Sequence, residues 1–303
     1  MLHKVTTAKR RFAARLSDVA AEVERCLARE LPAPEGHQSD IMAAMRYAAL
    51  GGGKRLRPFL VMETARLLGG RADHALTVGC ALECLHVYSL VHDDLPCMDD
   101  DAMRRGKPTV HRAYDEAIAV LAGDGLLTFA FELLAGEGAH ADPAVRARLV
   151  AELARASGTL GMIGGQVVDI TVEEGERDLS LITSLQAMKT GALIRFACKA
   201  GALVSGAAAH DLAAVDSYAT ALGLAFQIQD DVLDVEGDAQ SMGKAVGKDA
   251  DLGKATFVST LGLAGAKDKA RALGETAKAA LAPYGEKSHT LAGAVDFVLE
   301  RSH

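Results

Sequence analysis

Tryptophan is absent from this sequence, and tyrosine and phenylalanine are scarce, with 5 and 8 copies in 303 residues. A core without many large rings has to be packed mainly with aliphatic side chains. Half of the residues are hydrophobic, so that material is plentiful. Ala, Leu and Gly abound while runs of Val, Ile and Thr are few, a balance that favours helices over sheets.

Basic residues are in deficit, with 33 Lys and Arg against 40 Asp and Glu, which gives a net charge of −7. This balance excludes a global basic field for nucleic acid, so an anionic substrate would need local basic clusters or metal ions. The 5 cysteines are an odd number and lack the paired spacing of a zinc site. Such thiols suit a reducing compartment, and we expect a cytoplasmic protein.

Uninterrupted hydrophobic runs are short, and none reaches the ~18 uncharged apolar residues that a membrane span needs. We therefore expect no membrane span. The first 16 residues are mildly basic and amphipathic, as a transit peptide would be. Asp18, Glu22 and Glu24 follow soon afterwards, which favours an ordinary first helix.

Helical periodicity runs through most of the chain, and all 7 prolines stand at the boundaries of the helical segments. We expect helices over residues 7–30, 38–50, 58–69, 73–92, 111–137, 143–164, 179–206, 209–236, 254–282 and 287–301. No βαβ pattern and no repeat is found. The sequence thus predicts one all-α domain, residues 1–303, in which the polar, Gly-containing stretch 237–254 is a loop that covers the substrate.

Two groups of aspartates follow strongly apolar runs. The first group is in the segment LVHDDLPCMDDD and the second is in QIQDDVLDVEGD. Carboxylates removed from water are costly unless something compensates them, and grouping them adds repulsion. A hard cation such as Mg²⁺ offsets both costs, and it usually bridges to substrate phosphates. The pattern therefore predicts a diphosphate held between opposing helices, against the alternative of solvated acidic caps.

The spacing of each group indicates how it could hold a metal. Asp230 and Asp234 are four residues apart and share one helical face. Asp93 and Asp99 are six apart, about 240° around a straight helix. They can share an ion only if the chain turns between them, and Pro96 supplies the expected break.

Basic residues lie before and after the first aspartate group. GGGKRLRPF places Lys54, Arg55 and Arg57 before a helix start, which suits an anion site but also a solvated turn. Arg104 and Arg105 follow the first aspartate group, where they either bind substrate or neutralise Asp99 to Asp101. His86 lies seven residues before Asp93, on the same face, as a ligand or as a packed core residue.

Further polar residues interrupt apolar helices. Lys189 and Thr190 enter one such helix, and Gln227 lies one turn before Asp230. Gln166 and Asp169 form another polar pair one turn apart. Each is either part of a site or a buried polar group satisfied by a neighbour.

Taken together, these motifs resemble those of the trans-prenyl diphosphate synthases, specifically the bacterial farnesyl diphosphate synthase (geranyltranstransferase) type. The likeness runs from GGGKRLRPF through both aspartate motifs, RRGKPT, GMIGGQVVD and MKTGALI to the C-terminal FVLER. It implies the isoprenoid synthase fold, a large helical bundle around a central cavity, and a homodimer. It also implies three Mg²⁺ ions per active site, which Mn²⁺ can replace.

The resemblance assigns roles by position. Asp93, Asp99 and Asp230 would be direct metal ligands, while Asp94, Asp231 and Asp234 would act largely through metal-bound water. Isopentenyl diphosphate would be held by Lys54, Arg57, His86 and Arg105. The allylic diphosphate would be surrounded by Arg104, Lys189, Thr190, Gln227, Lys244 and Lys254.

The expected reaction is the head-to-tail condensation of isopentenyl diphosphate with dimethylallyl and geranyl diphosphates. Charge separation at the allylic carbon would be stabilised by magnesium and cationic side chains on one side. The positive charge on the carbocation would be stabilised by the Lys189 carbonyl, Thr190 and Gln227. Tyr88 and Ser89, one turn before Asp93, would limit chain length and favour farnesyl diphosphate, with geranylgeranyl diphosphate as the alternative product. A terpene cyclase or a non-catalytic partner subunit are the remaining alternatives.

Overall fold

The structure of this chain is a computed structural model, which describes residues 2–172, 178–240 and 256–301, with residues 2–8 and 238–240 as backbone only. The chain divides into two compact units. Unit 1 comprises residues 1–150 and 200–206, and unit 2 comprises residues 151–199 and 207–303. The prediction of a single domain over residues 1–303 stays a prediction.

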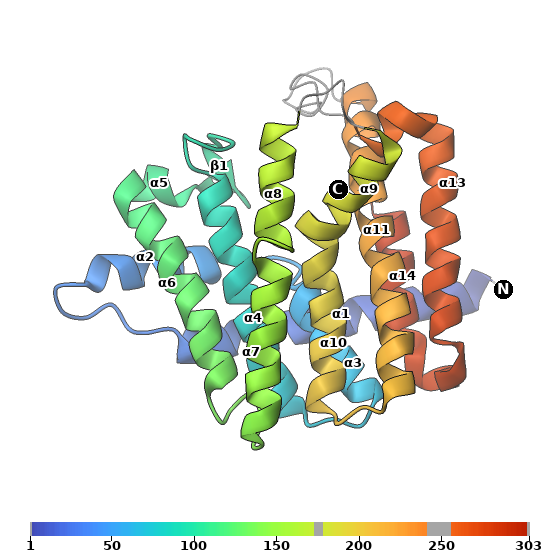
Figure 1. Cartoon of the computed structure of the whole chain (residues 1–303), viewed down its shortest axis with the longest axis horizontal. Helices are drawn as coiled ribbons and strands as arrows, with labels where there is room; N and C mark the ends of the chain where they lie inside the picture. The colour runs from blue at the N-terminus through green and yellow to red at the C-terminus, as the bar shows by residue number, and fades with distance from the viewer. Residues whose placement is uncertain (1, 173–177, 241–255, 302–303) are drawn as a thin grey trace. The chain divides into compact units, whose positions relative to one another are not determined.

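Unit 1 is built around one almost wholly buried helix. Its elements are α1 (Leu2–Glu30), α2 (Ser39–Ala49), α3 (Leu56–Leu67), α4 (Ala72–Asp93), β1 (Met103–Arg104), β2 (Lys107–Pro108), α5 (Val110–Ala113), α6 (Glu116–Ala135) and the first half of α7 (Pro143–Ser157). Helix α4 is mostly apolar, and it packs against α3, α6 and α1 (Figure 1). The carboxyl end of this core helix carries the first aspartate group.

Unit 2 is built around a long helix that carries the second aspartate group. It contains α8 (Met162–Thr171), α9 (Leu179–Gln186), the π-helical turn η2 (Ala187–Gly191), most of α10 (Ala192–Val204), α11 (Ala209–Gln240), α13 (Phe257–Ala280), the 3₁₀ turn η3 (Ala282–Ser288) and α14 (His289–Glu300). Helices α11 and α13 run alongside each other (Figure 1). Their contact includes the buried side chains of Ile228, Val232 and Phe257.

The predicted helices are present, but four of them are interrupted. One interruption is a kink in α13 at Gly262, whose φ of 71° is not helical. The segment 111–137 breaks at Tyr114, because the Asp115 carboxylate accepts from the Ile118 N–H at 2.7 Å and starts a new helix there. The segment 143–164 ends at Ser157, and α8 begins after Gly161. The segment 179–206 contains the π-helical turn η2.

A two-stranded hairpin was not predicted from the sequence. Met103 pairs with Pro108 and Arg104 with Lys107 in antiparallel register. The turn residues Arg105 and Gly106 both have positive φ, 51° and 76°, as two-residue hairpin turns of the primed type require. The hairpin therefore places Arg105 at its tip.

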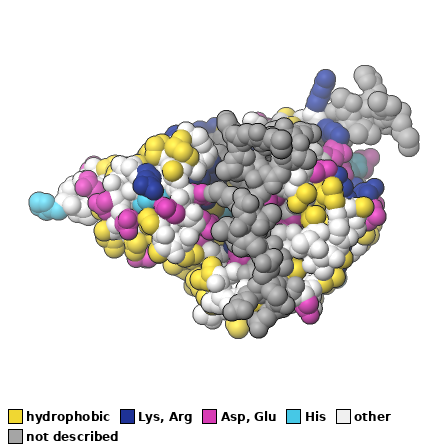
Figure 2. Space-filling view, turned by 90° about the horizontal axis from the view of Figure 1, so that it is seen from above, with side chains coloured by type: hydrophobic (Ala, Val, Ile, Leu, Met, Phe, Trp, Pro, Cys, Tyr) yellow, Lys and Arg dark blue, Asp and Glu magenta, His cyan; other side chains and the backbone are white. Residues whose placement is uncertain are grey.

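By length and hydropathy alone, α4 and α6 could each cross a membrane. In α4, 67% of the most apolar window is buried in the protein, as in the core helix of a globular unit. In α6 the share is 33%, and Val120 and Leu121 are 41% and 49% exposed. On the face shown in Figure 2, acidic, basic and hydrophobic side chains are interspersed.

Gly201 offers a test of helix packing in unit 1. A methyl group on Gly201 would lie 2.4 Å from the carbonyl oxygen of Val61 in α3. Gly201→Ala should therefore lower the free energy of unfolding by about 1–3 kcal/mol, measured by chemical denaturation. Gly265→Ala is the matched control, since there the methyl group would meet only Leu261 at 3.3 Å. It should be neutral or stabilising, and equal losses in the two variants would contradict the packing argument.

Candidate active site

The first aspartate group lies on a turn that folds back on itself. Helix α4 ends at Asp93, and the Asp99 N–H donates to the Asp93 carbonyl at 2.8 Å. The predicted break between these two aspartates is confirmed, with Pro96 inside the turn. Asp93 is half-buried and Asp99 is exposed. The turn thus brings together two residues that a straight helix would separate.

Asp94 is paired with an arginine of the hairpin. Its carboxylate is buried and accepts from Arg104, with Nη2 to Oδ1 at 2.6 Å and Nε to Oδ2 at 2.9 Å. Burial raises the pKa of Asp94, and the hydrogen bonds and charge of Arg104 oppose that rise. Arg104 also lies 3.7 Å from Asp101. In this structure Arg104 therefore forms ion pairs with the aspartate group, and its role in substrate binding stays a prediction.

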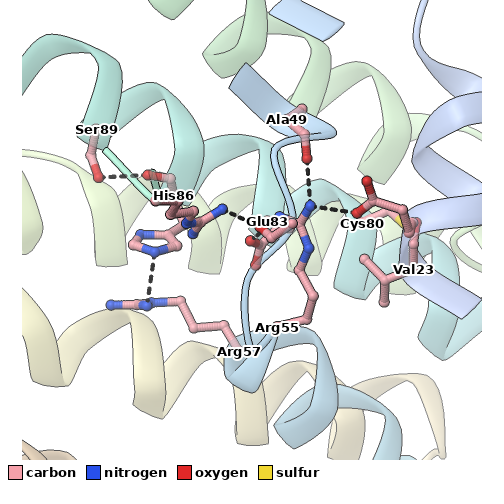
Figure 3. A network of polar contacts seen from close by, with 11 residues as sticks. Val23, Ala49, Arg55, Arg57, Cys80, Glu83, His86 and Ser89 are labelled. Atoms are coloured by element: carbon pink, nitrogen blue, oxygen red, sulfur yellow. Dashed lines mark hydrogen bonds and ion pairs between the residues drawn. The ribbon is translucent and has the colours of Figure 1, made fainter. Parts of the chain in front are cut away.

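Cationic side chains gather around His86 in the same unit. Arg57 Nη1 lies 3.2 Å from His86 Nε2 (Figure 3). Arg105, at the hairpin tip, donates to the carbonyl of Gly52, two residues before Lys54. Burial, followed by the charges of Arg57 and Arg105, holds the pKa of His86 well below its usual value. A neutral imidazole among guanidinium groups is suited to a multiply charged anion.

Tyr88 and Ser89 lie on the same helix but differ in their surroundings. The Tyr88 ring is buried and packs edge-on against His92, with centroids 5.4 Å apart. His92 Nε2 lies 3.0 Å from the Val120 carbonyl of α6. The Ser89 hydroxyl donates to the carbonyl of His86 at 2.8 Å. Tyr88 thus has the rigid support that a stop for a growing chain would need.

Lys189 and Thr190 lie in the π-helical turn of unit 2. Lys189 Nζ lies 2.7 Å from Asp169 Oδ2 of α8. The two segments approach closely because Gly165 has no side chain: a methyl group there would lie 2.5 Å from the Lys189 nitrogen. Asp169 therefore has a partner, one of the two outcomes that its sequence context allowed. Single π-turns within helices are frequent at functional sites.

A chain of hydrogen bonds links this turn to the second aspartate group. Thr190 Oγ1 donates to Gln227 Oε1 at 3.0 Å, and Gln227 Nε2 lies 3.3 Å from Asp231 Oδ1. The other oxygen of Asp231 accepts from the Phe257 backbone N–H at 2.8 Å. Asp231 is buried and thereby ties α11 to the first turn of α13. Thr190, Gln227 and Asp231 are therefore held in one network.

Asp230 is paired with the last described residue of the chain. Arg301 Nη2 lies 2.6 Å from Asp230 Oδ1 and donates to the Phe226 carbonyl at 2.7 Å. Its guanidinium also covers the Phe226 ring at 3.9 Å. Burial lowers the pKa of Arg301, while Asp230 raises it. A cation thus already contacts the carboxylate that was predicted to bind metal.

Within the described residues, no three Asp, Glu, His or Cys side chains gather as a ready-made metal site. Magnesium does not need one, because it commonly takes one or two carboxylates and completes its shell with waters and substrate phosphates. The turn that joins Asp93 and Asp99 fits this mode of magnesium binding. Asp230 fits it too, since its carboxylate already contacts a cationic group. Lys244 and Lys254, and most of the predicted loop 237–254, lie outside the described residues.

Residues 38–290 match the family model described as polyprenyl synthetase. The chain belongs to the polyprenyl synthetase family. Both the predicted family and the predicted all-α fold are confirmed.

Relatives of this polyprenyl synthetase cover nearly its whole length. A farnesyl diphosphate synthase of Geobacillus stearothermophilus is 43% identical over 289 residues, which are 95% of this chain and 97% of that protein. A geranylgeranyl diphosphate synthase of Cyanophora paradoxa is 40% identical over 272 residues, 89% of this chain and 90% of that protein. The apo crystal structure of an FPP/GFPP synthase from Zymomonas mobilis is 44% identical, with a TM-score of 0.86, covering 96% of this chain and 99% of that one.

Three features of this polyprenyl synthetase were not found from its sequence. Arg301 was quoted only as part of FVLER, and no spacing connects it to Asp230. Asp231 as the partner of Phe257 needs knowledge of how α11 and α13 pack. Glu83 did leave a signal in the sequence, since it is the one acidic residue in the mainly apolar segment 75–91. A buried carboxylate requires a partner, and its partner is Arg55.

The neutral state of His86 predicts how the stability of this polyprenyl synthetase depends on pH. The unfolded chain takes up a proton on His86 near pH 6.5, whereas the folded protein, whose pKa there is well below, does not. Stability is therefore lost as the pH falls through about 6.5. Between pH 7.5 and 5.5, the free energy of unfolding should fall about 1 kcal/mol more in the wild type than in His86→Gln. Equal pH dependence in urea titrations of the two proteins would contradict a neutral His86.

Proposed function

We propose that this polyprenyl synthetase condenses isopentenyl diphosphate head to tail with dimethylallyl and geranyl diphosphates to give farnesyl diphosphate. Relatives named farnesyl diphosphate synthase over nearly the whole chain support the proposal. The observation that carries it is the cluster of Arg57, Arg105 and neutral His86, next to Lys54. This cluster is an anion site separate from the aspartates, as a reaction between two diphosphates requires.

The aspartates provide for the allylic diphosphate. Asp93, Asp99 and Asp230 would hold Mg²⁺ directly, and Asp94, Asp231 and Asp234 would act through metal-bound water. Magnesium, when bound, supplies positive charge to the oxygens of the leaving diphosphate. Lys189, Arg104 and, outside the described residues, Lys244 and Lys254 would add cationic contacts. We expect three ions per active site, and Mn²⁺ to replace Mg²⁺.

The reaction follows from charge separation at the allylic carbon. The bond from C1 to the diphosphate oxygen breaks, and the electron pair leaves with the diphosphate. The Lys189 carbonyl, Thr190 Oγ1 and Gln227 Oε1 direct negative dipole ends at the carbocation. The isopentenyl double bond then attacks C1, and a proton is lost to the departed diphosphate. Water has to be excluded, because it would quench the cation.

The network around Gln227 supports this role. Gln227 Oε1 accepts from Thr190, so its oxygen has a fixed direction, and its amide nitrogen is directed at Asp231. Fixed dipoles cost no reorganisation when the charge develops. The two side chains would therefore be arranged before substrate binds.

Two other functions fit the site less well. A terpene cyclase needs only one diphosphate site, so the cluster around His86 argues against it. A non-catalytic partner subunit could lose an aspartate motif, and both are present here. Incubation with Mg²⁺, dimethylallyl diphosphate and labelled isopentenyl diphosphate separates the three: elongated diphosphates support the proposal, cyclic hydrocarbon indicates a cyclase, and no turnover indicates a partner subunit.

A homodimer in the cytoplasm completes the proposal. The exposed apolar side chains of Val120 and Leu121 on α6 would be covered in such a dimer. The substrates are small anionic molecules, and the acidic net charge of −7 favours no nucleic-acid partner.

Asp93→Asn and Asp230→Asn test the aspartate motifs. Each change keeps the shape of the side chain but removes the charge that holds a cation, so turnover should fall by about 10³-fold or more. Asp100→Asn is the control, because Asp100 is exposed, is paired with Arg112 at 3.2 Å and tolerates asparagine at its positive φ of 48°. It should keep near-normal turnover. Near-normal rates in either motif variant would refute the metal assignment.

Product length depends on Tyr88. Removing its ring should open the path beside α6, so that Tyr88→Ala makes products longer than C15, read by chromatography of the dephosphorylated products. The geranylgeranyl diphosphate synthase among the relatives keeps a C20 product as the second candidate. Ser89→Ala is a control, since the Ser89 hydroxyl is bonded within its own helix. An unchanged profile in Tyr88→Ala would remove Tyr88 from this role.

A further inference from the structure

Arg55 has a backbone conformation that is uncommon for a residue with a side chain. Its φ of 49° and ψ of 39° place it in the left-handed region, just before α3. Such a conformation costs about 1–2 kcal/mol and persists only when neighbouring contacts enforce it. The residue lies between Lys54 and Arg57, which we assign to the isopentenyl diphosphate site. What enforces the conformation of Arg55 therefore also sets the position of that site.

The enforcing contacts come from three other segments of unit 1. Arg55 Nη1 lies 2.6 Å from Glu83 Oε1 of α4, and Arg55 Nη2 lies 2.7 Å from Glu24 Oε2 of α1. The same nitrogen donates to the carbonyl of Ala49, at the end of α2, at 2.5 Å (Figure 3). The side chains of Arg55 and Glu83 are 1% and 2% exposed. The guanidinium thus pins the glycine-containing loop to three helices.

The register of these residues connects the buried pair to the anion site. Glu83 and His86 are three residues apart on α4, one helical turn. Arg55 and Arg57 are two apart at the start of α3. Arg55 contacts Glu83, and one turn further along α4 Arg57 lies 3.2 Å from His86. The Arg55–Glu83 contact therefore holds the start of α3 where Arg57 can reach His86.

We propose that the buried Arg55–Glu83 pair is the positioning device of the isopentenyl diphosphate site, holding Lys54 and Arg57 at the distance from His86 that a diphosphate requires. The inference rests on the proposed function. Buried ion pairs contribute little to stability compared with apolar packing, so a positional role accounts better for two buried charges. The planar fork of the guanidinium makes the position specific, because Nη1 contacts Glu83 while Nη2 contacts Glu24.

Glu83→Gln tests the proposal by its effect on the two substrates. The glutamine is isosteric but does not hold the guanidinium by charge, so the loop should shift. The KM for isopentenyl diphosphate should rise about 10-fold, since small misplacements of binding groups are costly. The KM for geranyl diphosphate should change less than about 2-fold. Arg55→Lys keeps the charge without the fork and should give a smaller rise in the same KM.

Glu63→Gln is the matched control. Glu63 is also a buried carboxylate of unit 1, held by Arg15 and Arg66, each at 2.7 Å. The chemical change is the same, but the ion-pair partners of Glu63 are Arg15 and Arg66 rather than Arg55. This variant should leave both KM values at their wild-type levels once its folding is verified by thermal denaturation.

The outcomes separate the inference from the function on which it rests. If the wild type elongates no diphosphate, the proposed function fails and the inference fails with it. If the wild type is active but Glu83→Gln changes neither KM, or both equally, the positioning role is wrong. The same holds if Glu63→Gln reproduces the rise. Should Glu83→Gln not fold, Arg55→Lys decides by the same comparison.

Discussion

The aspartates of the candidate site share one electrostatic constraint, namely that carboxylates next to apolar helices need compensating partners. Asp93 and Asp94 lie at the end of the largely buried helix α4, and Asp230 and Asp231 follow an apolar stretch of α11. Removing a carboxylate from water costs several kcal/mol unless a partner compensates it. The nature and place of each partner therefore determine what the site can do.

The protein's own groups meet part of that need without any metal. Asp94 is held by Arg104, Asp169 by Lys189 and Asp230 by Arg301, each within 2.7 Å. Asp231 instead accepts backbone and amide hydrogen bonds. These ion pairs differ in burial: the side chain of Arg301 is 10% exposed, whereas that of Arg104 is 32% exposed. Of the three ion-paired carboxylates, Asp230 is the most exposed, at 44% against 4% for Asp94 and 10% for Asp169, so it is the one most accessible to a metal.

Sequence reasoning succeeded where a short-range rule applies. Helical periodicity predicted the helices, and the six-residue spacing of Asp93 and Asp99 required the turn that Asp99 N–H and the Asp93 carbonyl now close. It failed where local capping overrode the periodic pattern, as at Asp115, which starts a helix inside a predicted one. It also failed where a partner is distant in sequence. Arg301 and Asp230 are 71 apart in number, and only the packing of α11 with α14 brings them together.

The most direct test of the account is the location of the metal ions. Crystals grown with Mn²⁺ and an unreactive thiolo analogue of geranyl diphosphate would show the ions by their anomalous scattering. We predict ions on the carboxylates of Asp93 and Asp99, and an ion on that of Asp230 that displaces Arg301. A bound diphosphate analogue with no ion on either aspartate group would contradict the proposed metal assignment.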